Sequence, residues 1–153
     1  MSVRGDKAYV LFLSGYNCTQ AVIGAYAAVI GMAFKPGVRF APGFGGGMGR
    51  LREVCGTFSG AVIVVNALYG YSDPKNVQAK AELYSRIQEL AAQFRRDNGS
   101  IICKELLGLS RPEGSPIPEA RTDEYYKKRP CPELCRYSAN MLEEYIREHP
   151  PVK

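Results

Sequence analysis

The 153-residue sequence has no tryptophan, a single histidine and no Cys-x-x-Cys pair, and these absences exclude several kinds of site. His149, which two prolines follow, is poorly placed to act as the base of a Cys–His or Ser–His hydrolase. Without a Cys-x-x-Cys pair, the sequence offers no zinc ribbon, no thioredoxin motif and no attachment site for c-type haem. We therefore expect no haem.

Long apolar runs and dense charge are missing as well. No stretch approaches the roughly 18 uninterrupted apolar residues of a membrane span, so we expect no membrane insertion. The net charge is +5, yet there is no block of about five or six like charges and no reading motif, so we expect no nucleic-acid partner. The default location for such a chain is cytoplasmic.

What the sequence does contain is cysteine, at positions 18, 55, 103, 131 and 135. In a reducing compartment, thiols in this number more often bind metal or do redox work than form structural disulfides. Their separations of 37, 48, 28 and 4 residues match no metal-binding spacing, so only the fold can bring them together. Cysteine as a small buried hydrophobe is the alternative.

Apolar residues recur every three or four positions, which predicts an all-α, single-domain bundle of about five helices over residues 1–153. We expect helices over about 5–32, 50–69, 74–97, 100–107 and 132–148, with a further helical turn near 123–127. Asp73 and Pro74 are residue types favoured at the N-cap and first position of the third helix. The glycine-rich segment 41–49 is expected to be an interhelix loop.

The glycine-rich segment matches no nucleotide-binding fingerprint. Counting from Gly43, the sixth position is Met48 rather than glycine, and no Gly-Lys pair forms a P-loop. Two interpretations stay open. The segment is either a tight turn that needs positive φ angles or a backbone that closely approaches a cluster or ligand.

Gly56 and Gly60 fall inside the second predicted helix, where each costs about 1 kcal/mol relative to alanine. Their spacing of four favours either the close approach of another helix or a site built around Cys55. If this helix starts after Gly49, Cys55 lies in its second turn, where the helix dipole has little effect on a thiol. The nearby Arg50 and Arg52 would lower the pKa of Cys55.

Several ordered segments resemble a redox-active protein family defined by a cysteine, a Cys-Gly-Ala-x-x-Gly motif and two further cysteines. The matching segments are SGYNCTQA (14–21), GFGGGMGR (43–50), CGTFSG (55–60), GSIICKELLG (99–108) and CP (131–132). The resemblance covers about residues 8–145. Thr57 stands where the motif has alanine, which adds a hydroxyl and leaves the cysteine and both glycines intact.

The resemblance implies that the defining cysteines are Cys18, Cys55, Cys103 and Cys131, and that Cys135 is an extra one. A related domain occurs in split-Soret cytochrome c, where cysteines of this type are associated with an iron–sulfur cluster. The resemblance thus implies that the four cysteines bind such a cluster or another metal. The backbone approaching it would then come from four glycines: Gly45, Gly46, Gly47 and Gly56.

Three functions fit these residues. The first is electron transfer to a redox partner protein through a cluster or metal on the four cysteines, with Arg39, Arg50 and Arg52 as a positive rim. The second is metal-free thiol–disulfide redox chemistry, for which Cys131 and Cys135 lie four residues apart on one helix. The third is a non-catalytic helical module whose cysteines bind zinc or only pack. Glycine-lined helix faces also leave a homodimer open.

Overall fold

Helices make up the fold of the computed structural model, which describes residues 2–110 and 114–152. Within these ranges there are nine α-helices and no strand, apart from an isolated bridge between Val54 and Ile102. The helices are α1 (Val3–Leu13), α2 (Cys18–Tyr26), α3 (Phe34–Phe40), α4 (Gly45–Met48), α5 (Gly56–Tyr69), α6 (Val77–Asn98), α7 (Cys103–Leu106), α8 (Asp123–Lys128) and α9 (Cys131–Glu148), with a 3-10 turn η1 at Pro42–Phe44. The all-α prediction is confirmed, and the predicted number of about five helices is wrong.

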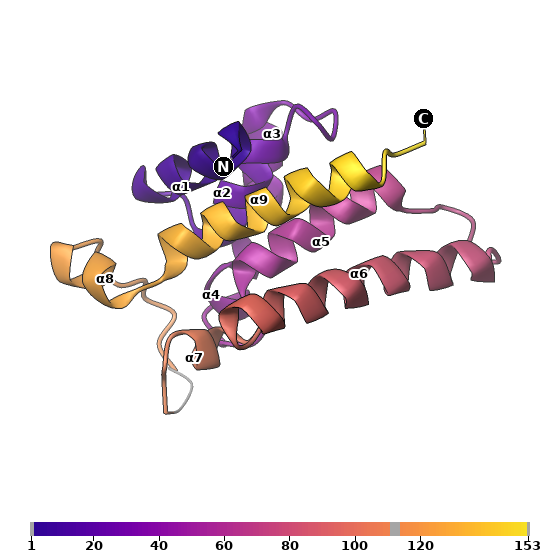
Figure 1. Cartoon of the computed structure of the whole chain (residues 1–153). Coiled ribbons are helices and arrows are strands. Elements are labelled where there is room, and N and C mark those ends of the chain that lie inside the picture. Colours follow the sequence, from indigo (N-terminus) through magenta and orange to yellow (C-terminus); the bar gives the residue numbers. More distant parts are fainter. Residues whose placement is uncertain (1, 111–113, 153) are drawn as a thin grey trace.

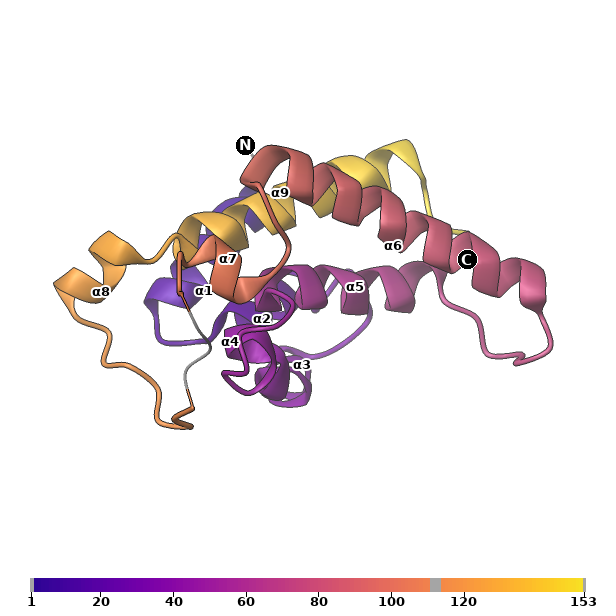
Figure 2. The same ribbon diagram turned by 90° about the horizontal axis from the view of Figure 1, so that it is seen from below.

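The long helices pack side by side around one hydrophobic core. α1 packs on α2 and α9, α2 packs on α5 and α9, and α6 runs along α5 (Figures 1 and 2). The short helices α4, α7 and α8 gather at one end of this arrangement, where α5 and α9 also begin. The connections at that end therefore lie next to the N-termini of the core helices.

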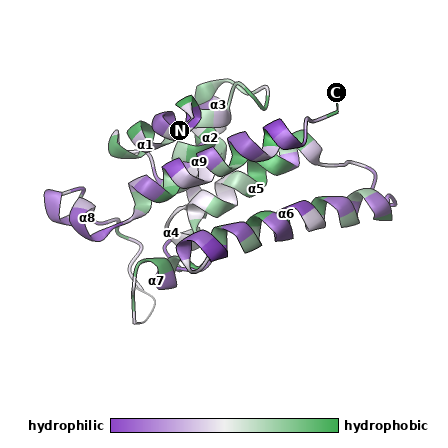
Figure 3. Cartoon of the chain, in the orientation of Figure 1, coloured by the Kyte–Doolittle hydropathy of each residue, from purple (hydrophilic) through white to green (hydrophobic). Residues whose placement is uncertain are grey.

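Hydrophobic burial holds the arrangement together. The largest fully buried side chains come from α2, α6 and α9: Tyr26, Ile23, Phe94, Leu90 and Leu142. α6 and α9 carry apolar residues on the side that faces the other helices and polar residues on the opposite side (Figure 3). None of the described helices is both long enough and apolar enough to cross a membrane.

The helix predicted over 5–32 is wrong, because the chain breaks between α1 and α2. Gly15 adopts a φ of 109°. Asn17 then caps α2, its side chain accepting from the amide of Gln20 while the Gln20 side chain accepts from the amide of Asn17. This capping box moves Cys18 from the middle of a predicted helix to the first residue of a real one.

The second predicted helix starts six residues later than expected, at Gly56 instead of residue 50. Arg50 and Arg52 adopt φ angles of 66° and 61°, which a helix cannot accommodate. The following backbone pairs with residues 101–103 instead: the amide of Cys55 donates to the carbonyl of Ile101, and the amide of Cys103 to that of Glu53. This pairing brings Cys55 and Cys103 to the same end of the bundle.

The remaining boundaries differ less. α6 is capped by Asn76, not by Asp73, whose carboxylate accepts from the amide of Lys75 within a turn. Only Cys103–Leu106 of the predicted 100–107 helix is helical. α3 and α4 were not expected at all. The turn near 123–127 and the final helix are confirmed as α8 and α9.

Candidate functional site

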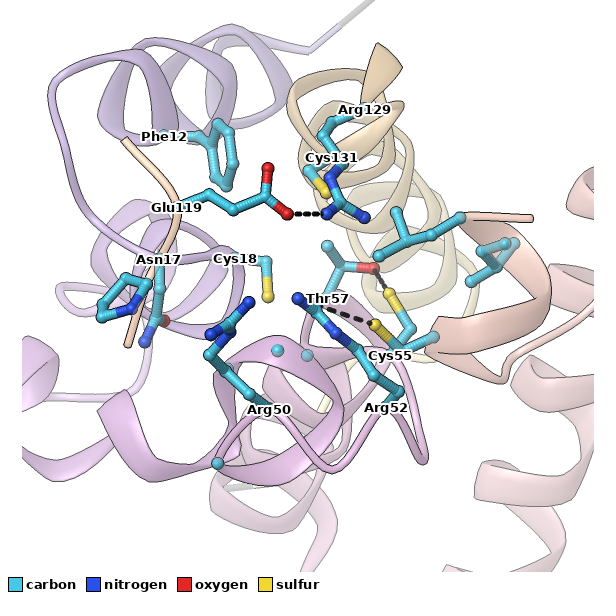
Figure 4. A pocket seen from close by; sticks show the side chains of 18 of the residues that line it. Phe12, Asn17, Cys18, Arg50, Arg52, Cys55, Thr57, Glu119, Arg129 and Cys131 are labelled. Atoms are coloured by element: carbon cyan, nitrogen blue, oxygen red, sulfur yellow. Dashed lines mark hydrogen bonds and ion pairs between the residues drawn. The ribbon is translucent and has the colours of Figure 1, made fainter. Parts of the chain in front are cut away.

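Each of the four predicted cysteines lies at the beginning of a different helix. Cys18, Cys103 and Cys131 are the first residues of α2, α7 and α9, and Cys55 is the N-cap of α5. The earlier placement of Cys55 in a second helical turn is therefore wrong. All four line one cavity of about 440 Å³ at the end of the bundle (Figure 4).

Cys18, Cys55 and Cys103 are buried, Cys131 is half-buried, and the thiols interact electrostatically. Burial, together with the nearby Cys18, raises the pKa of Cys55 to about 12, although the hydroxyl of Thr57 opposes this. Burial raises the pKa of Cys131 to about 12, and the thiols of Cys18, Cys55 and Cys103 raise it further. The expectation that Arg50 and Arg52 lower the pKa of Cys55 is therefore wrong, because burial of the thiol raises it. As free thiols, Cys55 and Cys131 are protonated at neutral pH.

The four cysteines border one cavity, and no metal-binding arrangement is found among these four described residues. In the part of the chain that the structure describes, no three Cys, His, Asp or Glu side chains already form a metal-binding group. All five cysteines are free thiols. Whether the four thiols hold a metal stays a prediction.

The four predicted glycines take different places around the thiols. Gly45, Gly46 and Gly56 line the cavity. Gly47 lies behind it, because a Cβ there would come within 2.7 Å of the Cβ of Cys103 and 2.6 Å of the amide nitrogen of Glu53. The role of these glycines in holding a cofactor stays a prediction.

Gly56 and Gly60 allow α2 to lie close to α5. A Cβ on Gly56 would stand 2.3 Å from the Sγ of Cys18, and one on Gly60 would stand 3.0 Å from the Cβ of Val22. Both interpretations of this glycine pair are compatible with the structure, since the same spacing packs the helices and brings Cys18 next to the start of α5.

The chain from Gly46 to Arg52, which includes most of α4 and the segment after it, has an unusual backbone. Gly46, Gly47 and Gly49 have positive φ angles, which confirms the tight-turn interpretation, and so do Met48, Arg50 and Arg52. A left-handed residue other than glycine costs about 1–2 kcal/mol. Backbone hydrogen bonds from Arg52 to Gly46 and from Glu53 to Gly47 hold the segment in this form.

Arginine side chains surround the thiols. Arg50 and Arg52 project from the strained segment into the cavity, while Arg129 approaches from the end of α8 (Figure 4). Arg121, which precedes α8, also lines the cavity. Nη1 of Arg52, a side chain only 7% exposed, lies 3.7 Å from the Sγ of Cys103. The predicted rim residue Arg39 instead lies exposed in the last turn of α3.

Two of these arginines, Arg121 and Arg129, and the carboxylate of Glu119 were not predicted from the sequence. Arg121 donates to the carbonyls of Phe12 and Tyr16, and Arg129 forms an ion pair with Glu119. Arg121, Arg129 and Glu119 belong to a connection with little regular structure. No periodicity or motif in that connection signals that it folds over the cavity.

Buried hydroxyl groups fix the start of α5. The hydroxyl of Thr19 donates to the carbonyl of Gly56 at 2.9 Å, and the hydroxyl of Ser138 donates to that of Thr57 at 2.8 Å. Thr19, Thr57 and Ser138 are fully buried. α2 and α9 thereby hold the two residues that follow Cys55.

Cys135 lies apart from this set. Its side chain is completely buried one turn after Cys131, and its Sγ lies 3.8 Å from the carbonyl oxygen of Cys18. It packs in the core beneath the cavity, whose lining includes the other four cysteines.

The fold is helical, and four cysteines from four helices line one cavity together with several arginines. These features define a class of helical proteins whose site is built from cysteines. The comparison with known families agrees with that class. Residues 16–145 match the family described as "Putative redox-active protein (C_GCAxxG_C_C)", and the chain belongs to this family. The motif cysteine of this chain is Cys55, which follows Val54 and precedes Gly56 and Gly60. No curated protein and no solved structure matches the chain.

Proposed function

We propose that this protein is a one-electron carrier whose cysteines Cys18, Cys55, Cys103 and Cys131 bind an iron–sulfur cluster. The observation that carries the proposal is their convergence from four separate helices on one cavity. Four cysteine thiolates are the usual ligand set of [2Fe–2S] and [4Fe–4S] clusters.

The size of the cavity favours a cluster over a single ion. Four thiolates on one zinc ion, each about 2.3 Å from the metal, must nearly touch one another. A cluster distributes its thiolates over several irons, so they stand further apart. A space of about 440 Å³ bordered by four thiols suits the larger unit.

The charges around the cavity also favour a cluster. Among the described residues, four arginines line the cavity against one carboxylate, that of Glu119. A cluster held by four thiolates is net negative, so these guanidinium groups would lower the cost of burying it. The N-termini of α2, α5 and α9 add partial positive charge close to Cys18, Cys55 and Cys131.

The thiol environment disfavours the metal-free alternative. A cysteine that exchanges disulfides needs an accessible thiolate, which a lowered pKa supplies. Here burial raises the pKa of both Cys55 and Cys131 to about 12. A bound metal removes this obstacle, because its own positive charge stabilises the thiolates.

When bound, the cluster would supply one-electron chemistry, with a reduced partner protein as the electron donor and an oxidised one as the acceptor. The protein residues hold and shield it. The four cysteines bind it, the arginines balance its charge, and Phe12 and Leu106 exclude water from the cavity wall. The partner is a redox protein.

The test is anaerobic reconstitution with ferrous iron and sulfide, followed by iron and sulfide analysis. We expect the wild-type protein to bind both, and Cys18→Ala, Cys55→Ala, Cys103→Ala and Cys131→Ala to lose most of the bound iron. Cys135→Ala is the matched control and should load like the wild type. Zinc uptake without iron uptake would favour the structural module, and uptake that is indifferent to all four cysteines would refute the proposal.

A further inference from the structure

Thr57 brings a hydroxyl group into contact with a cysteine of the site. Its Oγ1 lies 3.2 Å from the Sγ of Cys55, and its side chain is completely buried on the cavity wall. In the free thiol, either atom can be the donor of this hydrogen bond. A cysteine that binds metal has no proton, so in that state only the hydroxyl can donate.

The position of this hydroxyl is fixed from three helices. Thr57 is the second residue of α5, directly after Gly56. The hydroxyl of Ser138 in α9 binds the carbonyl of Thr57, and the hydroxyl of Thr19 in α2 binds that of Gly56. These two hydrogen bonds hold the carbonyls of Gly56 and Thr57 and so keep the first turn of α5 beside Cys55.

We propose that Thr57 is a positioning residue that sets the reduction potential of the centre by donating a hydrogen bond to the Cys55 thiolate. The inference rests on the proposed function. Reduction adds one electron to the iron and increases the negative charge on the sulfur ligands, which strengthens a hydrogen bond to them. The bond therefore stabilises the reduced state more than the oxidised state and raises the potential. No proton is transferred in this step.

Two substitutions of Thr57 separate the hydroxyl from the shape of the side chain. Thr57→Val keeps the branched shape and removes the hydroxyl, whereas Thr57→Ser keeps the hydroxyl. Thr57→Ser is therefore the matched control, because it keeps the hydroxyl that bonds to the sulfur. If Thr57→Val does not fold, as judged by circular dichroism, Thr57→Ala takes its place.

The experiment is a redox titration of the reconstituted proteins, followed by visible absorption, with iron and sulfide measured on the same samples. We expect Thr57→Val to load like the wild type and to have a more negative midpoint potential, while Thr57→Ser stays near the wild-type value. Equal potentials in equally loaded Thr57→Val and wild-type protein would overturn this inference and leave the proposed function standing. A wild-type protein that takes up no iron or sulfide would overturn both.

Discussion

Gly56 has no side chain, and the place that a Cβ would occupy lies against the sulfur of Cys18. The Cβ of an alanine would lie 2.3 Å from this sulfur and 2.5 Å from the Oγ1 of Thr19, much closer than atoms can approach. Overpacking of this kind costs about 1–3 kcal/mol, which exceeds the roughly 1 kcal/mol that alanine gains over glycine inside a helix. Packing therefore decides the residue at this position.

We predict that Gly56→Ala lowers the free energy of unfolding by about 1–3 kcal/mol and reduces iron loading, because α2 has to shift and Cys18 with it. Urea unfolding and iron analysis measure the two effects. Gly43→Ala is the control, since a Cβ there meets nothing within 4 Å. A Gly56→Ala protein as stable and as well loaded as Gly43→Ala would contradict this account of the motif.

Thiol reactivity gives a second prediction for single residues. Because burial raises the pKa of Cys55 and of Cys131 to about 12, both stay protonated at pH 7, and their thiolate fractions grow as the pH rises toward 12. We predict that in the folded, metal-free protein both are alkylated by iodoacetamide at least about tenfold more slowly than glutathione at pH 7. Mass spectrometry of quenched samples gives the rates, with guanidinium-unfolded protein as the control. One rapidly alkylated cysteine would support thiol–disulfide chemistry instead.

The individual residues of the site were only partly predictable. Cysteine chemistry identified the candidates, since the sequence has little else that binds metal or carries electrons. Arg121 and Arg129 were not predictable, because they reach the cavity through a connection without periodicity. The contact of Thr57 with Cys55 depends on where α5 begins, which the helical pattern placed six residues too early.

Among the elements, the helix N-termini matter most, because each of the four cysteines occupies one. For α2 the position is set by Asn17, whose side chain accepts from the amide of Gln20 and donates to the carbonyl of Pro42. The same side chain thus starts the helix and ties it to the turn before α4. The residue pair Asn17 and Gln20 was a readable start signal, which the apolar period running through Val22 concealed.

We predict that Asn17→Ala costs about 1 kcal/mol of stability and also reduces iron loading, because the N-terminus of α2 frays and Cys18 loses its fixed position. Asn76→Ala is the matched control: Asn76 caps α6 through the amide of Ala79, in a helix whose start lies away from the cavity. It should lose similar stability in urea and load normally. Equal loading of the two variants would show that the start of α2 does not position the site.

The segment before α5 shows why apolar periodicity alone cannot predict where a helix begins. The apolar period continues from Leu51 into α5, so the pattern alone extends the helix too far toward the N-terminus. What stops it is pairing with residues 101–103, which are distant in sequence, and the hydrogen bonds back to Gly46 and Gly47. Only the tertiary structure contains that information.

At the scale of the whole molecule, the cavity lies where α2, α5, α7 and α9 meet, and four arginines converge on it. A negatively charged group at this point would relieve the repulsion between them and link the four helix ends. A ligand that binds only the folded state also stabilises that state by mass action. The site and the stability of the fold are therefore coupled.

We predict that the reconstituted protein has a higher melting temperature than the same protein stripped of iron by a chelator. Calorimetry under anaerobic conditions measures the difference. Cys103→Ala, treated identically, should show none, because it lacks one of the four thiols. A reconstituted wild-type protein that melts with its stripped form would mean that any bound iron lies outside the cavity.

The most direct test of the central claim is the iron and acid-labile sulfide content of the wild-type protein isolated without oxygen. The account predicts a coloured protein that contains iron and sulfide in equal amounts, with visible absorption that bleaches on reduction. A colourless, iron-free protein that stays so after reconstitution, with all four thiols open to alkylation, would contradict it.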